Sequence, residues 1–147
     1  MTLTRAQLCC YVVVFGTCLL ESCKSKSVHV RVTVAGSHGE GSLVNFMSVR
    51  HADVPGAKRL VREWLYEGKY NSKYEQAKIE LGNLRQGDPI YLAVHGQEAV
   101  GDLPAGDWVV LLVGAKGVKW LGTVVNIDSS SETFYLNFSE FTPPEKL

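Results

Sequence analysis

The sequence predicts a mainly β domain, an antiparallel sandwich with a short helical insertion, and an α+β fold is the alternative. Residues 28–35 place valine at every second position, as in a strand with one buried and one solvent-facing side. Six or seven short segments rich in β-branched and aromatic residues follow one another, bounded by Gly, Asp, Pro or Ser. Only residues 55–67 carry a clear helical pattern.

Two strands and this helix are expected in the first half of the folded region. A glycine-rich turn at residues 36–41 separates the strand at 28–35 from a second strand at 43–49. Asp53 stands where a helix cap is expected, and Gly68 is expected to end the helix.

The segment from residue 71 to residue 84 fits two structures. It opens with a Ser-x-x-Glu capping box, which would begin a helix. Its apolar residues Ala77, Ile79 and Leu81 alternate with charged residues, as they would in a strand. We expect a strand over residues 74–81.

The last third of the chain is expected to be β structure. The segments are short, rich in Val, Leu, Phe, Tyr and Trp, and bounded by turn residues. The expected strands cover residues 90–94, 108–113, 118–127 and 133–138.

A short pattern occurs twice, at residues 82–88 and 101–107. Both copies have Gly, Leu, Gly and Asp at equivalent places, and a Leu and a Val follow each copy at the same spacing. The pattern predicts two turn-then-strand units of the same design.

In the second copy, Leu103, Pro104, Gly106 and Trp108 resemble the L-P-x-G-x-Y turn and strand of carboxypeptidase-regulatory-like, transthyretin-like and PEGA-type sandwich domains. In those domains the Leu fills the core, Pro-x-Gly forms the turn and the aromatic residue begins the next strand. Residues 114–125 are similar to the hairpin and final strands of the same modules. The resemblance implies an Ig-like or transthyretin-like sandwich that serves as a structural or binding module.

The N-terminal segment has the pattern of an export signal. Arg5 precedes an uncharged, mostly apolar run at residues 8–20. At about 1.5 Å per residue this run is too short as a helix to cross a hydrocarbon core of about 30 Å. A buried core helix and a short membrane anchor are the alternatives.

All four cysteines lie in the first 23 residues. The sequence Leu20-Glu21-Ser22-Cys23 resembles the lipobox of bacterial lipoproteins, with Leu at −3, a small residue at −1 and Cys at +1, and departs from it at Glu21. The resemblance implies cleavage before Cys23 and lipidation, with a fatty acid such as palmitate, at that cysteine. An ordinary secreted protein and an uncleaved membrane anchor remain the alternatives.

These features divide the chain into four parts. We expect a lipoprotein signal peptide at residues 1–22, a lipidated tether at 23–27, a β-sandwich domain at 28–142 and a disordered tail at 143–147. The protein would face the periplasm or the cell surface of a bacterial envelope. Without a cysteine after Cys23, the domain would fold without disulfides.

Charge argues against a nucleic-acid partner. Removing residues 1–22 removes Arg5 and Glu21, so the fifteen charges of each sign in the whole chain fall to fourteen of each. A neutral domain lacks the basic surplus of a nucleic-acid binder.

Few residues suggest chemistry, and we expect no enzyme activity, no metal site and no cofactor. The four histidines have no close ligand spacing such as HxH. His51 with Asp53 could give two ligands, and Asp88 with Asp107 a carboxylate pair, but turn positions explain these side chains. A His with a nearby Asp or Glu in the fold would favour an enzyme or metal site.

The candidate partner-binding surface is aromatic. Tyrosines recur every four residues and are interleaved with lysines, a combination suited to protein or glycan contact. The alternative is that the rings pack the helix onto the sandwich. The candidate residues are Trp64, Tyr66, Lys69, Tyr70, Lys73 and Tyr74.

We therefore expect a lipid-anchored envelope protein that works as a non-catalytic structural or protein-interaction module. A periplasmic module that binds a small ligand or glycan is the alternative, and a hydrolase or metal-binding protein is the least favoured.

Overall fold

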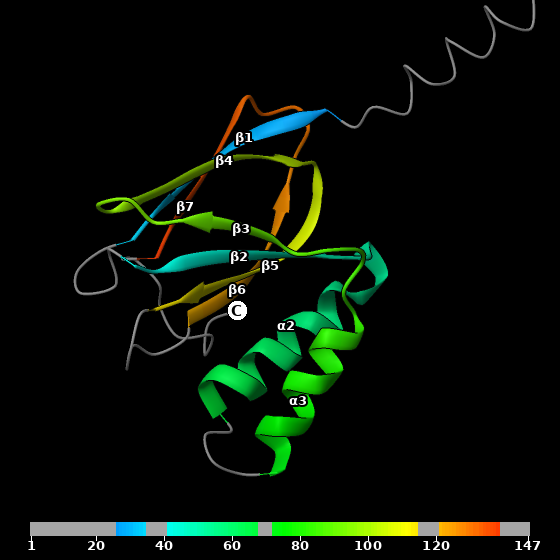
Figure 1. Ribbon diagram of the computed structural model, residues 1–147. Helices are drawn as coiled ribbons and strands as arrows, with labels where there is room; N and C mark the ends of the chain where they lie inside the picture. The colour runs from blue at the N-terminus through cyan, green and yellow to red at the C-terminus, as the bar shows by residue number, and fades with distance from the viewer. Residues whose placement is uncertain (1–25, 35–40, 68–71, 115–120, 139–147) are drawn as a thin grey trace, which may run out of the picture.

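The computed structural model describes residues 26–34, 41–67, 72–114 and 121–138. Two β-sheets pack face to face, and a helical layer covers the outer face of one of them (Figure 1). The mainly β sandwich predicted from the sequence is confirmed, with the helices inserted between the second and third strands.

The seven strands form a three-stranded sheet A and a four-stranded sheet B. Sheet A has the order β4 (Glu98–Pro104), β1 (Ser27–Thr33), β7 (Thr133–Asn137). Sheet B has the order β3 (Ile90–Ala93), β2 (Leu43–Val49), β5 (Gly106–Val113), β6 (Leu121–Ile127). One neighbour pair departs from the antiparallel arrangement, because β1 and β7 run parallel.

Helical structure begins directly after β2. A 3-10 turn (His51–Asp53) leads into α2 (Val54–Arg62), which continues as a π-helical turn (Glu63–Glu67). A second helix, α3 (Ser72–Asn83), follows. Asp53 makes no side-chain cap, contrary to expectation, because its carboxylate accepts a hydrogen bond from Arg50 Nε at 2.8 Å.

The core between the sheets explains the valine pattern. Val28, Val30 and Val32 of β1 are fully buried against the inner face of sheet B. Trp108 of β5 packs edge-on to Phe46 of β2, with the ring centroids 6.3 Å apart. Each of these side chains occupies one of the alternate positions of its strand that point toward the core.

Sheet B is buried on both faces. Trp108, Val110 and Leu112 of β5 face the sandwich core, whereas Val109 and Leu111 face the helices. A strand covered on both sides reads as a continuous apolar run, which is the sequence of β5.

The predicted strand at residues 74–81 is wrong, since these residues belong to α3. Ala77 and Leu81 are buried against the helical layer, but Ile79 is 58 % exposed. A strand would have placed all three on one face, and the capping-box interpretation gave the right element type.

The expected turn at residues 101–107 is wrong in its first half. Strand β4 continues to Pro104, and the chain crosses from sheet A to sheet B at Ala105. Gly106 has a φ of 145°, which favours glycine at this corner, and Leu103 is fully buried. The first copy of the repeated pattern lies on the end of α3 and the following loop, so the two copies are not similar units.

Several predictions concern segments outside the described residues. They include the leader at 8–20, Cys23, most of the turn at 36–41, the start of the strand at 118–127 and the tail at 143–147. Within the described part of the chain, neither helix has the length and hydropathy needed to cross a membrane.

Candidate functional site

The structure describes three side chains of the predicted aromatic surface, those of Trp64, Tyr66 and Tyr74. Lys69 and Tyr70 lie outside the described residues. Lys73 belongs to α3, and its side chain is outside the described part of the molecule.

Trp64 lies inside the helical layer. Only 5 % of it is exposed, and its ring is tilted against that of Tyr74 with the centroids 6.4 Å apart. Both residues pack in the cluster that joins the helices to Met47 and Val49 of β2. The ring of Trp64 is therefore not available to a partner.

Tyr66 fastens the helical layer to the edge strand β6. Its hydroxyl donates a hydrogen bond to the carbonyl of Gly122 at 3.0 Å and accepts one from the N–H of Gly122 at 3.2 Å. Burial raises the pKa of Tyr66, and the hydrogen bond from the Gly122 backbone opposes part of that rise. These three aromatic residues hold the helices on sheet B, which is the alternative left open by the sequence.

The outer face of sheet A is the open surface of the sandwich. Among the described residues, helices cover only sheet B (Figure 1). Arg31, Val100 and Tyr135 on the outer face of sheet A are exposed. Arg31 stands in the middle of this face, in register with Val100 on β4 and Tyr135 on β7. Tyr135 is 71 % exposed and Val100 is 45 % exposed, the first being the most exposed of the large hydrophobic side chains described. We call the row Val100–Arg31–Tyr135 the sheet A row.

The residues of the sheet A row were not predicted from the sequence as a binding surface. The signal was present, because Tyr135 alternates with the inward-facing Phe134 and Leu136. An aromatic residue at a solvent-facing strand position is the feature that could have identified it.

One histidine–carboxylate pair lies beside this row. His29 and Asp102 are cross-strand neighbours, and Nδ1 of the histidine is 3.1 Å from Oδ1 of the aspartate. Both side chains are well exposed, so the pair adds polar character to the face of sheet A.

A second pair has a more buried carboxylate. Nδ1 of His51 lies 3.0 Å from Oδ2 of Asp107, and Nδ2 of Asn126 donates to the other carboxylate oxygen at 2.9 Å. The Asp107 side chain is 11 % exposed and that of His51 is 91 % exposed. The Asp107 carboxylate therefore orients the His51 ring through Nδ1, and Nε2 points away from the carboxylate. Asp53, the metal-site partner considered for His51, is paired with Arg50 instead.

Neither pair forms part of a metal site among the described residues. No group of three or more His, Cys, Asp or Glu side chains there is placed to hold a metal ion. A zinc site needs three or four converging ligands, and each histidine pair supplies two at most.

A cleft of about 360 Å³ lies between α2 and α3. Leu60 and Leu84 contribute apolar lining, and Arg59 and Glu80 contribute charges. Its lining contains no aromatic ring of the kind expected for a glycan site.

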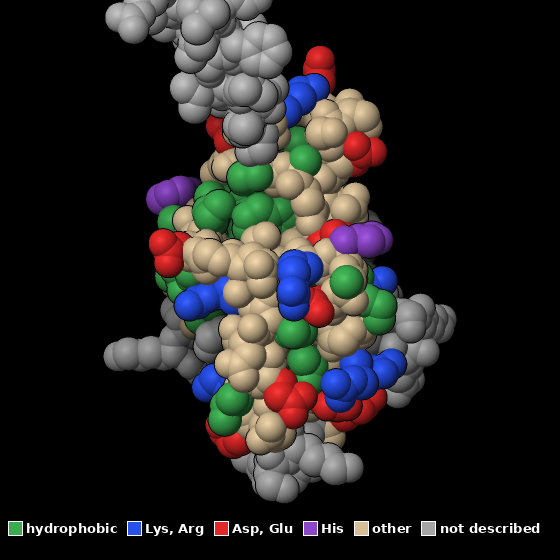
Figure 2. Space-filling view, turned by 90° about the vertical axis from the view of Figure 1, so that its right-hand side faces the viewer, with side chains coloured by type: hydrophobic (Ala, Val, Ile, Leu, Met, Phe, Trp, Pro, Cys, Tyr) green, Lys and Arg blue, Asp and Glu red, His purple; other side chains and the backbone are tan. Residues whose placement is uncertain are grey.

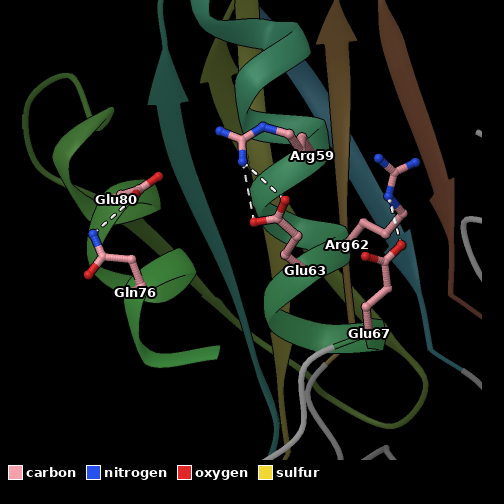
Figure 3. A network of polar contacts seen from close by, with 6 residues as sticks. All are labelled: Arg59, Arg62, Glu63, Glu67, Gln76 and Glu80. Carbon is pink, nitrogen blue, oxygen red and sulfur yellow. Dashed lines mark hydrogen bonds and ion pairs between the residues drawn. The ribbon is translucent and has the colours of Figure 1, made fainter. Parts of the chain in front are cut away.

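The charges beside the cleft have partners along their own helices (Figure 3). Arg59 Nη1 donates to both Glu63 oxygens at 3.0 and 3.3 Å, and Gln76 Nε2 donates to Glu80 at 2.9 Å. On the next turn, Arg62 Nε lies 3.1 Å from Glu67 Oε1 as an ion pair. A ligand in the cleft would compete with these contacts for the same groups.

No protein-family model matches this chain, and no curated protein is significantly similar to it.

Proposed function

We propose that this chain is a lipid-anchored protein of the bacterial envelope whose sandwich is a non-catalytic protein-interaction module. The observation that carries the proposal is the sheet A row, an exposed aromatic residue and an exposed aliphatic residue on either side of Arg31. Tyr and Arg are enriched at the centres of protein interfaces and supply much of their binding energy.

The surroundings of the row support a protein partner over a small ligand. The cleft described between α2 and α3 is the kind of concavity that small-molecule sites need, and none of the residues that line it belongs to the sheet A row. The described polar neighbours on this face, His29 with Asp102, are suited to the rim of an interface.

The cysteine distribution supports the anchor. Cys23 is the first residue of the expected tether, and no cysteine follows it in the chain. If the leader is cleaved, Cys23 is the only thiol left to carry an acyl chain. Acylation at two or more positions gives stable attachment, whereas a single chain is marginal.

The interaction is tested with a photoreactive phenylalanine in place of Tyr135 in the full chain. Ile79, an exposed residue on the helical layer, is the matched control position. Crosslinking in the native envelope is expected to yield one discrete product from position 135 and none from position 79, and Arg31→Glu should weaken the product. Equal yields from both positions would contradict the assignment of sheet A.

The anchor has a separate test. Metabolic labelling with a fatty acid should mark the protein, and Cys23→Ala should remove the label. Label that persists in the variant would exclude Cys23 as the acylated residue.

The cleft between α2 and α3 supports a second candidate, a small-ligand module. A Cβ at Gly56 would meet nothing within 4 Å, so Gly56→Leu would extend into open space at the cleft. Native mass spectrometry of the purified protein should then show a retained small molecule that the variant loses. The absence of any retained mass, in wild type and variant alike, would remove this candidate.

A further inference from the structure

We propose that the end of the sandwich at which β1 begins lies against the lipid headgroups, so that the strands of sheet A lead away from the membrane. This inference rests on the proposed acylation of Cys23. It adds the orientation of the domain and identifies a second contact surface, whose partner is the headgroup layer.

The tether between Cys23 and the first strand is short. Lys26 is the first described residue, and Ser27 begins β1. Three residue steps separate Cys23 from Lys26, and a fully extended chain covers at most about 3.6 Å per step, or about 11 Å in all. An acylated Cys23 would lie at the membrane surface, so Lys26 must lie close to that surface too.

Two other segments meet at the same end. Pro104 of β4 is paired with Ser27, and the β4–β5 corner continues from it. Ile127 of β6 is paired with Gly106, and the carbonyl of Glu132 accepts a hydrogen bond from the His29 N–H at 3.2 Å. We call this surface the anchor-side end; it comprises the start of β1, the β4–β5 corner and the β6–β7 connection.

The anchor-side end is on the right in Figure 1 and faces the viewer in Figure 2. Hydrophobic side chains gather in the upper half of this view. Pro104 and Ala105 at the β4–β5 corner are half-buried.

Charge does not provide the attraction. Asp128 and Glu132 in the β6–β7 connection are exposed acids, which anionic headgroups repel. Asp102 and Asp107 near the corner are paired with histidines. The short tether, and not an affinity of this end for lipid, must therefore set the orientation.

The opposite end of the molecule defines the expected contrast. Thr33 ends β1 and is paired with Glu98, beside the hairpin that contains Gln97. Six residue steps at about 3.3 Å place this hairpin about 20 Å farther along the strand direction than Ser27. With the anchor-side end at the membrane, Gln97 should be remote from the headgroups.

Single spin labels measure this contrast. Ser129→Cys labels the anchor-side end and Gln97→Cys the hairpin, both at exposed loop positions. The full chain, processed and acylated in cells, is placed in vesicles of phosphatidylethanolamine and phosphatidylglycerol that contain a nickel-chelating lipid. Collisional relaxation by nickel is expected to be several-fold stronger at position 129 than at 97. Equal relaxation, or stronger relaxation at 97, would overturn the orientation.

A variant with a longer tether tests whether the short tether sets the orientation. Inserting about twelve Gly and Ser residues after Lys26 gives a flexible linker with a root-mean-square length of about 20 Å. The difference between the two labels should then disappear, and a difference that persisted would overturn the role of the tether.

Flotation with the vesicles and fatty-acid labelling separate this inference from the proposed function. A protein that carries no acyl chain overturns both. A protein that is acylated and floats, but shows no contrast between the two labels, overturns the orientation alone.

Discussion

Tyr66 and Gly122 join the helical layer to the edge of sheet B through two hydrogen bonds. The tyrosine hydroxyl donates to the Gly122 carbonyl at 3.0 Å and accepts from its N–H at 3.2 Å, across 56 positions in the sequence. One side chain therefore satisfies both backbone polar groups of an edge-strand residue. The same contact explains why an aromatic residue at this position belongs to the fold.

Tyr66→Phe should lower the free energy of unfolding by about 1–3 kcal/mol, because it removes both hydrogen bonds and leaves a part-buried N–H and carbonyl without them. Urea denaturation of the mature domain measures the change. Tyr135→Phe is the matched control, and because Tyr135 is exposed its effect should stay within about 0.5 kcal/mol. Equal effects of the two substitutions would contradict the importance of the Gly122 contact.

Alkaline pH should weaken the same contact. Burial raises the folded-state pKa of Tyr66 above its ordinary value of 10.0, so the unfolded chain releases this proton first as the pH rises. Above about pH 10 the native state then binds more protons than the unfolded state, and stability falls with pH; below that pH the contribution of Tyr66 is constant. The advantage of wild type over Tyr66→Phe, measured by urea denaturation from about pH 9 upward, should be constant up to about pH 10 and should shrink above it. A constant difference over this range would contradict the raised pKa.

Two glycines should respond oppositely to alanine. A Cβ at Gly122 would lie 2.7 Å from Leu111 Cδ2 and 2.7 Å from Leu65 Cδ1, both in buried side chains, so Gly122→Ala should cost about 1–3 kcal/mol. A Cβ at Gly56 meets nothing within 4 Å, and Gly56→Ala within α2 should stabilise the domain by about 0.5–1 kcal/mol. Thermal unfolding of the two variants measures the contrast. Destabilisation by both would show that the helical layer has no open space at Gly56.

The elements that could be predicted from the sequence are those with one buried face or a continuous apolar run. Strand β1 shows its valines at alternate positions, and the bounds of β2 match the expected residues 43–49. Strand β5 has no alternation, but its β-branched and aromatic residues, bounded by turn residues, predicted a strand over residues 108–113. In each case the order of apolar and polar residues along the strand shows which of its faces are buried.

Strand β4 could not be identified because two of its residues have the signature of a turn. Gly101 lies in the middle of the strand, where a Cβ would come within 2.5 Å of Leu92 Cδ2. A glycine in a strand often marks such a close approach, and the neighbour that demands it lies on another strand. Pro104 ends the strand at the corner, next to the change of sheet.

The candidate site was harder to predict than the fold. Trp64, Tyr66 and Tyr74 have the composition of an interface, but the face they turn inward depends on where the helical layer lies on sheet B. The aromatic neighbour of Tyr135 in the sequence, Phe134, faces inward, so Tyr135 gains its setting from Arg31 and Val100 through long-range strand pairing. Neither the inward orientation of the three aromatic residues nor the strand pairing around Tyr135 can be predicted from sequence spacing alone.

Two of the three residues that made α3 ambiguous can test its placement. Leu81→Ala should lower the free energy of unfolding by about 2–5 kcal/mol, because Leu81 is 1 % exposed and packs in the helical layer. Ile79→Ala should change stability by no more than about 0.5 kcal/mol, because Ile79 is 58 % exposed on the opposite side of the helix. Urea denaturation of both variants measures the two losses in the free energy of unfolding and their ratio. In a strand these residues would share one face, so similar losses from the two substitutions would restore the strand over residues 74–81 and remove the helical layer in its present form.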